Sequence, residues 1–234
     1  MSMADEDPGF SIHFEIYSKA EISEIIDLID NAHQNNLSFK NTSSLYAVRR
    51  FIVELPQLVP ILFNRNLSEL IYSKFGTGYF ISKSIYFDKP PNSNWFVAYH
   101  QDLTIAVEKK VKMPGFNAWT VKHDQLAVQP PLSLLVNNFT VRIHLDDTND
   151  HNGALRVIPG SHMKGICRTD MIDRNFDSEV ICNVPGGGVM LMRPLLLHAS
   201  SKSASQTRRR VIHIEFSKQE LPEPLQWAEK YILE

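Results

Sequence analysis

The stretch VPGGGVMLMRPLLLHASSKSASQTRRRVIHIEF, residues 184–216, says most about the fold of this chain. A Gly-rich turn leads into an apolar run that predicts a strand ending on His198. A polar, Ser-rich loop follows, and a second predicted strand opens with three arginines. We therefore expect His198 to face into the mouth of a β structure, with Arg209 entering from the adjacent strand.

Before this stretch, the sequence pattern predicts helices first and then strands. Ser18 followed by Glu21 is typical of a capping box, and it predicts a helix that ends near residues 35–36. A second helix is predicted over 58–75. Short runs rich in Ile, Val, Phe and Tyr then alternate with Pro, Gly, Asn and Asp clusters, at residues 79–87, 95–107, 132–145, 154–158, 188–197 and 209–216. The pattern predicts an α+β chain, mainly β, whose strands form a sandwich or barrel.

Composition narrows the class of protein. The chain has 234 residues, 43% of them hydrophobic, which suits one domain with a sizeable core. Its net charge of −2 and scattered basic residues argue against nucleic acid or a membrane as partner. Cys167 and Cys182 are the two cysteines, and the acidic start MSMADEDPGF does not resemble a secretory signal, so we expect a cytoplasmic protein. Nothing in the pattern specifies an oligomeric state.

A histidine and an aspartate lie one residue apart in the strand-like run WFVAYHQDLTIAV, residues 95–107. On a strand, His100 and Asp102 would share a face and present half of a metal chelate. A metal that activates O₂ needs two histidines and one carboxylate on one face, which leaves the opposite face open. The pair alone is weak evidence, because His-x-acid pairs also begin at residues 13, 144 and 213.

His198 and Arg209 supply the context that singles out one of these pairs. A dicarboxylate held at both ends needs a metal to chelate one end and a fixed guanidinium for the far carboxylate. The spacing of His198 and Arg209 therefore suggests a site for 2-oxoglutarate.

With these residues the sequence resembles the phytanoyl-CoA dioxygenase family of iron(II)- and 2-oxoglutarate-dependent oxygenases. The similar segments follow in order: GFSIHFEIYSKAEISEIIDLI (9–29), KPP (89–91), YHQDL (99–103), HLDDTNDHNGALRVIPGSH (144–162), PGGGVMLMRPLLLHAS (185–200) and RRRVIHIEF (208–216). The resemblance implies a double-stranded β-helix, a cupin-like jelly roll with flanking N-terminal helices, as a single domain over 1–234. Within it we expect disorder over 1–8, a strand and helices over 9–78, the jelly-roll core over 79–216 and a C-terminal extension over 217–234.

The resemblance also implies roles for individual residues. His100, Asp102 and His198 match the iron ligands, Arg209 matches the arginine that binds the far carboxylate of 2-oxoglutarate, and Ser200 matches an assisting serine. Two alternatives stay open. Arg210 would replace Arg209 if the register slipped by one residue, although it would then point outward. His144 with Asp146 could replace the pair at 100 and 102, although that segment resembles the family's turn after the iron-binding pair.

The chain departs from the family pattern in the strand before LDD, where Arg142 stands in place of an apolar or aromatic residue, with His144 on the same face. We read Arg142 and His144 as a binding site for an acidic group of the substrate; the alternative is that Arg142 pairs with a nearby carboxylate. The connection over 103–132 is predicted to be a lid-like loop, to which Phe116, Trp119 and His123 could contribute pocket residues or, for Trp119, an anchor.

The implied reaction uses Fe(II), 2-oxoglutarate and O₂ to oxidise a small molecule, with release of succinate and CO₂. The carboxylate of Asp102 favours hydroxylation, or a related desaturation or cyclisation, over halogenation, since halogenating relatives lack this ligand. Two alternatives are a jelly-roll metalloenzyme that uses zinc or manganese without O₂, and a non-catalytic binding module. The substrate itself is not specified by the sequence.

Overall fold

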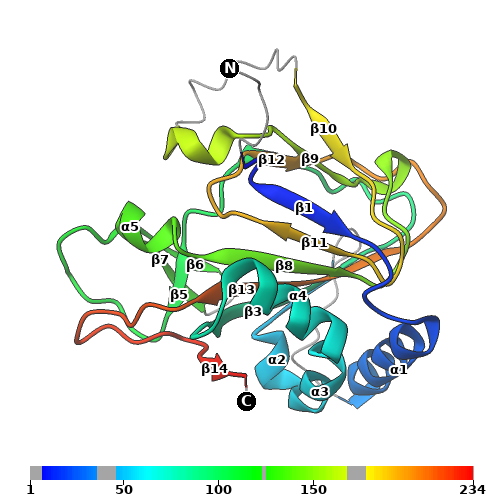
Figure 1. The fold of residues 1–234 in the computed structure, drawn as a ribbon, viewed down its shortest axis with the longest axis horizontal. Helices are drawn as coiled ribbons and strands as arrows, with labels where there is room; N and C mark the ends of the chain where they lie inside the picture. Colours follow the sequence, from blue (N-terminus) through cyan, green and yellow to red (C-terminus); the bar gives the residue numbers. More distant parts are fainter. Residues whose placement is uncertain (1–6, 36–45, 123–124, 168–177, 234) are drawn as a thin grey trace.

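The computed structural model describes residues 7–35, 46–122, 125–167 and 178–233. The predicted disorder over 1–8 falls mostly on residues outside these ranges. Figure 1 shows two facing groups of strands, with α1 to α4 gathered beside the larger one. In chain order the elements are β1 Phe10–His13, α1 Lys19–Asn35, β2 Tyr46–Arg49, α2 Phe51–Glu54, η1 Pro56–Leu58, α3 Val59–Leu62, α4 Arg65–Phe75, β3 Phe80–Lys89, β4 Val97–His100, β5 Ile105–Val107, β6 Asn117–Lys122, β7 Gln125–Gln129, α5 Leu132–Leu135, β8 Phe139–His144, η2 Asp150–Asn152, β9 Leu155–Val157, η3 Ser161–Lys164, β10 Val180–Cys182, β11 Val189–Met192, β12 His198–Ser200, β13 Arg209–Ser217 and β14 Tyr231–Ile232.

The strand pairs of the described residues are all antiparallel, and most of them belong to two principal sheets. The large sheet has the order β1-β11-β8-β13-β3-β14, with β2 also paired to β3, and the small sheet has the order β10-β9-β12-β4. Consecutive neighbours in space are distant in sequence, as in a jelly roll. The mainly β fold with N-terminal helices is therefore the predicted one.

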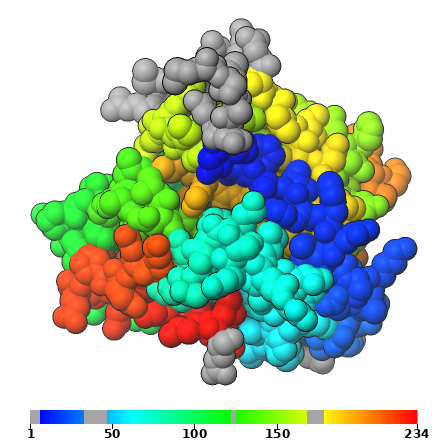
Figure 2. Space-filling model, viewed as in Figure 1, coloured from blue at the N-terminus to red at the C-terminus, as the bar shows by residue number. Residues whose placement is uncertain are grey.

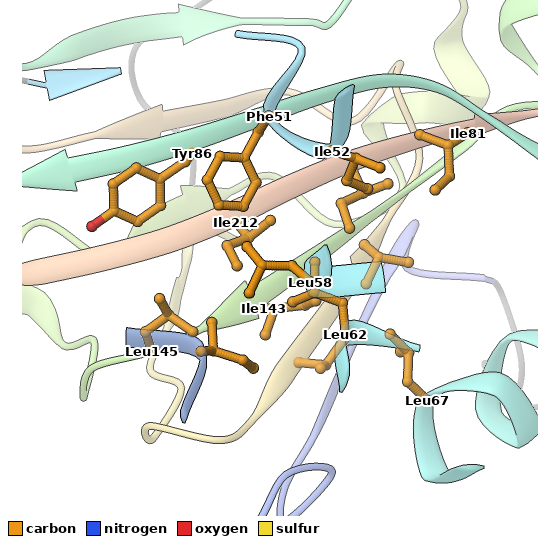
Figure 3. Packing of buried hydrophobic residues seen from close by; sticks show 14 of the residues in the cluster. Phe51, Ile52, Leu58, Leu62, Leu67, Ile81, Tyr86, Ile143, Leu145 and Ile212 are labelled. Atoms are coloured by element: carbon orange, nitrogen blue, oxygen red, sulfur yellow. The ribbon is translucent and has the colours of Figure 1, made fainter. Parts of the chain in front are cut away.

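The two faces of the large sheet differ because side chains alternate along each strand. On one face Val141, Ile143, Ile212 and Ile214 join a core with the helices α1 to α4. Figure 3 shows Ile143 and Ile212 beside helical residues such as Leu58. In Figure 2 the helical segments in blue and cyan cover this side of the molecule. The opposite face turns toward the small sheet.

The space between the sheets is partly apolar. Met190 and Met192 of β11 pack there with Leu155 and Val157 of β9 and with Cys182 of β10. The rest of this inner face carries charged and polar side chains, which build the site described below.

The first predicted helix is confirmed as α1, and the second is divided into shorter helices. Ser18 and Glu21 form the predicted capping box, with Glu21 N–H donating to Ser18 Oγ at 3.2 Å and Ser18 N–H to Glu21 Oε2 at 2.8 Å. The single helix predicted over 58–75 is instead η1, α3 and α4. The break falls at Asn64, whose side chain accepts from Leu67 N–H at 2.9 Å and so starts α4.

Three strand predictions need correction. The run 95–107 is two strands, β4 and β5, and Asp102 lies between them. The run 132–145 begins with the helical turn α5. The predicted strand ending on His198 stops at Met192, because Arg193 and Pro194 turn the chain, and His198 begins β12 in the other sheet.

The segment 103–132 is not an open loop. It forms a third sheet of order β5-β7-β6, followed by α5. Its apolar residues, among them Phe116 and Val128, pack with Trp227 of the C-terminal extension. The extension itself returns along the large sheet, where Tyr231 pairs with Ile81 of β3. Among the described residues, no helix has the length and apolar character to cross a membrane.

Candidate active site

Two neighbouring strands of the small sheet, β4 and β12, bring together the side chains of His100, Asp102 and His198. The antiparallel pairing of β4 and β12 sets His198 directly opposite His100, and the ring centroids lie 4.2 Å apart. Asp102 follows β4, and its Oδ2 lies 3.8 Å from Nε2 of His198. One ligand atom from each of the three residues lies within 4.8 Å of the others. A single metal ion can therefore bridge all three side chains.

The hydrogen bonds of His100 and His198 use Nδ1 of each ring and leave Nε2 free to bind a metal. Nδ1 of His100 is 2.9 Å from the carbonyl of Ala98, and Nδ1 of His198 is 2.8 Å from the carbonyl of Leu196. Each Nδ1 therefore carries the hydrogen, and each Nε2 keeps a lone pair, which is the arrangement that orients metal-binding histidines. Oδ2 of Asp102 is buried without a hydrogen-bond partner among the described residues. Two imidazole nitrogens and one carboxylate on one side suit iron(II).

The charge states at the centre also suit a metal. Burial lowers the pKa of His198 to about 4, so its ring is neutral near pH 7. For Asp102 burial opposes ionisation, but the electrostatic interactions with His198, His213 and the ammonium of Lys83 outweigh it and hold the pKa of the carboxyl below its usual value. Both groups are therefore in the protonation states that bind a divalent ion.

Gln101, between the two candidate ligands, ties this part of the chain to its surroundings. Its Nε2 donates to the carbonyls of Gly165 at 2.8 Å and Leu195 at 2.6 Å, and its Oε1 accepts from Cys167 N–H at 2.8 Å. Asp102 N–H donates to the Pro194 carbonyl at 2.8 Å. These bonds connect the turn before His198 with the segment that carries His100 and Asp102.

Arg209 projects from β13 of the opposing large sheet. The prediction that it enters from a strand adjacent to that of His198 is therefore wrong. Its side chain is buried, with Nη1 donating to the carbonyl of Gly153 at 2.7 Å and Nε buried without a partner among the described residues. Ser200 Oγ donates to the same carbonyl at 2.9 Å. Burial and the charge of Arg142 lower the pKa of Arg209 to about 9, so it remains charged at neutral pH.

Arg210 points to the other side of β13, as alternation predicts. It holds Asp146 in a bidentate ion pair, with Nε to Oδ2 at 2.8 Å and Nη2 to Oδ1 at 2.7 Å. Asp146 is thereby committed to Arg210. Neither Asp146 nor His144 belongs to a potential metal-binding group in the described part of the chain, so the geometry does not favour that alternative pair.

Arg142 lies on the inner face of β8 and begins a chain of buried polar contacts. Its Nη1 is 2.9 Å from Nδ1 of His213, Nε2 of His213 is 3.2 Å from Oε1 of Glu215, and Nζ of Lys83 is 2.7 Å from the same oxygen. The alternative, that Arg142 pairs with a nearby carboxylate, is not the arrangement found, because its side-chain partner is His213. Asp102, His213 and Glu215 also form a second group of potential ligands within 4.8 Å.

His144 shares the inner face of β8 with Arg142. Its Nδ1 is 2.8 Å from Oγ1 of Thr148, while its Nε2 is buried without a partner among the described residues. Burial, with the charges of Arg142 and Arg209, holds the pKa of His144 well below its usual value. His144 is thus a neutral ring between two buried guanidinium groups.

Phe116 and Trp119, two of the three candidates in 103–132, lie in or against an apolar cluster away from the three candidate metal ligands. Phe116 is buried in the apolar cluster under the third sheet, and Trp119 packs against that cluster, as an anchor would. His123 lies outside the described residues.

Lys83 and Lys89 on β3 were not singled out from the sequence, and His213 with Glu215 on β13 was noted only as one of the His-x-acid pairs. The signal was the even spacing within two apolar strands, SKSIYFDK (82–89) and RRRVIHIEF (208–216), because Lys83 and Lys89 are six residues apart and His213 and Glu215 are two residues apart. Such spacing indicates a polar face turned inward.

A jelly roll that joins two histidines and an aspartate in one half, with a buried arginine in the other, has the arrangement of the 2-oxoglutarate-dependent non-haem iron oxygenases. Comparisons with known proteins agree. The family model for phytanoyl-CoA dioxygenase (PhyH) matches residues 64–211, more than half of the chain. This protein belongs to the phytanoyl-CoA dioxygenase family, whose enzymes depend on iron(II) and 2-oxoglutarate.

Individual relatives are more distant. Phytanoyl-CoA dioxygenase domain-containing protein 1 of Danio rerio is 30% identical over 139 residues, which cover 50% of this chain and 46% of the relative. The match thus spans about half the length of that protein. Among solved structures, EctD from S. alaskensis in its apoform has a TM-score of 0.70 at 16% identity over 94% of this chain and 77% of its own. The carbocyclase SnoK from nogalamycin biosynthesis has a TM-score of 0.66 at 14% identity over 92% and 81%.

Proposed function

We propose that this protein hydroxylates a small molecule with O₂ and 2-oxoglutarate as co-substrates. The observation that carries the proposal is the convergence of two free Nε2 atoms and one unpartnered carboxylate oxygen at His100, His198 and Asp102. These residues would hold iron(II) through a nitrogen, nitrogen, oxygen set that leaves the remaining coordination positions for co-substrate and O₂. When bound, the iron couples decarboxylation of 2-oxoglutarate to succinate and CO₂ with insertion of an oxygen atom into a substrate C–H bond.

The residues of the chain would bind and orient rather than transfer protons. Arg209, with Nε and part of its guanidinium unused, would take the far carboxylate of 2-oxoglutarate, and Ser200 would donate to the same group. Both now donate to the Gly153 carbonyl, so the pocket holds them in place before the anion arrives. A metalloenzyme that does not consume O₂ and 2-oxoglutarate would have no use for this buried guanidinium.

Arg142 and His144 would contact the substrate, which we propose carries a carboxylate. The charges support this: Lys83 has Glu215 and Arg210 has Asp146, whereas Arg142 has no carboxylate within ion-pair distance among the described residues. Iron(II) and Asp102 would be balanced by the near carboxylate of 2-oxoglutarate, and the far carboxylate would lie beside Arg209. Arg142 is then a buried cation left for the substrate.

Hydroxylation is preferred over halogenation because Asp102 occupies the position that a halide would need. Desaturation and ring closure would use the same residues, and the mass of the product separates them from hydroxylation. A cytoplasmic location is proposed from the cysteine usage, with Cys167 and Cys182 both free.

The decisive experiment is an anaerobic titration of the protein with iron(II) and 2-oxoglutarate, watched for the metal-to-ligand charge-transfer band. We expect the band in the wild type and its loss in His198→Ala. A screen of small carboxylic acids, scored by succinate release above the substrate-free rate, then searches for the substrate. Absence of the band with intact, folded protein would contradict the proposal.

A further inference from the structure

Lys89 is a buried lysine beside Arg209 in the inner wall. It is the last residue of β3, it is fully buried, and the strand register sets it directly across from Arg209 of β13. Its ammonium donates to the carbonyl of Ser201 and lies 5.5 Å from the ring centroid of Trp95. Two long cationic side chains thus enter the same part of the interior from neighbouring strands.

Both cations, together with Ser200, converge on Gly153. Arg209 Nη1 and Ser200 Oγ donate to its carbonyl, and a Cβ on this residue would lie 2.5 Å from Nζ of Lys89. Gly153 also has φ of +80°, a conformation that other residues rarely adopt. The glycine therefore allows Lys89 to reach the donors that surround it, which forms a compact cluster of cationic and hydroxyl groups.

The charged groups around Lys89 do not neutralise it. Arg209 is the neighbour whose charge acts on it most strongly. Asp88, the preceding residue, faces the other side of β3 and pairs with Arg208, with Arg208 Nε to Oδ1 at 2.8 Å. Asp150 pairs with Arg156 at 3.0 Å, outside this wall.

On β8, His144 on the inner face is neutral, because burial and the charges of Arg142 and Arg209 lower its pKa. Two adjacent buried cations without a carboxylate are unfavourable unless an anion joins them.

We propose that Lys89 is a second cation for the far carboxylate of 2-oxoglutarate, which would lie between Lys89 and Arg209. The inference rests on the proposed function and adds a binding residue to the co-substrate site. It also predicts a proton movement. Burial, with Arg209 beside it, lowers the pKa of Lys89 to about 7, so part of the free protein carries a neutral amine at neutral pH. A bound carboxylate favours the ammonium, so binding above pH 7 takes up a proton.

The sign of the pH effect follows. Below about pH 7 Lys89 is already charged, and its contribution to the affinity for 2-oxoglutarate is complete. As the pH rises above 7, protonation must accompany binding, and the affinity falls by up to about tenfold per pH unit until the pKa of the complex is reached. A lysine with a purely structural role would produce no such profile.

The test measures the dissociation constant of 2-oxoglutarate on anaerobic, iron(II)-loaded protein, from the charge-transfer band and by calorimetry in buffers of different ionisation enthalpy. In the wild type at pH 8 we expect net proton uptake. In Lys89→Met we expect roughly 10- to 100-fold weaker binding, the range for loss of a charge-assisted hydrogen bond, and no proton uptake. Lys110→Met is the matched control, because Lys110 also lies over a tryptophan ring, 5.9 Å from Trp119, but is exposed.

If Lys89→Met does not fold, Lys89→Arg replaces it: a permanently charged side chain should retain binding and abolish proton uptake. Wild-type binding without proton uptake, together with a variant that binds as tightly as Lys110→Met, would overturn the inference and leave the proposed function intact. A wild type that binds iron(II) but not 2-oxoglutarate would overturn both.

Discussion

Replacing Asp102 and Asp146 separately by alanine should separate a metal ligand from a structural carboxylate. Asp102 has a buried oxygen without a hydrogen-bond partner among the described residues, but Lys83 and the nearby histidines lower its pKa, so its removal in the metal-free protein should reduce the free energy of unfolding at neutral pH. Its loss should also lower the affinity for iron(II) by more than about a hundredfold, since even supporting groups of metal ligands contribute about 10- to 100-fold.

Asp146→Ala should lower stability and leave the affinity for iron(II) unchanged. The carboxylate accepts from the backbone N–H of Arg210 at 2.8 Å and from two nitrogens of its guanidinium, and the pair is mostly buried. We expect a loss of about 2 kcal/mol, between the values for exposed ion pairs and for shielded charge-assisted hydrogen bonds. For a chain of this size that corresponds to a Tm lower by about 4–8 °C.

Calorimetric unfolding of the metal-free proteins measures the change in stability, and anaerobic iron(II) titration measures the change in metal affinity. Asp102→Asn and Asp146→Asn serve as conservative partners, since they keep the side-chain volume. The reasoning would be refuted if Asp146→Ala lost the metal while Asp102→Ala kept it, because His144 and Asp146 would then be the true pair.

Three further outcomes can be checked. Gln101→Ala should lower iron(II) affinity about tenfold or more by releasing the segment between the ligands, whereas Asn64→Ala, which removes three comparable hydrogen bonds at α4, should lower only Tm. Arg142→Leu should keep the charge-transfer band and reduce turnover of a carboxylate substrate, chiefly through KM; an unchanged KM would exclude its proposed role. Burial raises the pKa of Glu229 to about 6, so its contribution to stability is complete below the ordinary carboxyl pKa and is lost as the pH rises through 6. Relative to Glu229→Gln, the wild type should therefore lose up to about 2 kcal/mol between pH 4.5 and pH 7 in denaturant titrations.

Alternation along strands made part of the site predictable. Because side chains two residues apart share a face, Arg209 had to lie on the side opposite Arg210, and Arg142 on the same side as His144; the structure has both arrangements. The triad needed more than alternation. His100 and His198 are far apart in sequence, and nothing local pairs β4 with β12, so their convergence came from the family resemblance.

Other features depended on contacts that no local pattern encodes. The break before α4 is set by Asn64, whose cap competes with continuation of the helix. In the sheet formed by 103–132, apolar and polar residues alternate only weakly along the strands. Trp227, close to the C-terminus, stabilises this sheet by packing against it. Lys89 could be recognised as part of the site only once β3 was known to pair with β13.

The second group of potential ligands, Asp102 with His213 and Glu215, is poorly suited to hold an ion beside the proposed iron site. Arg142 can only donate, so Nδ1 of His213 is an acceptor and its Nε2 carries the hydrogen that Glu215 accepts. His213 thus has no lone pair left for a metal. Glu215 also accepts from the ammonium of Lys83 at 2.7 Å. The positive charge of this ammonium would repel a second metal ion bound at Glu215. Asp102 is therefore left to the site it shares with His100 and His198, and Arg142 is held in the orientation from which its remaining N–H groups can bind an anion.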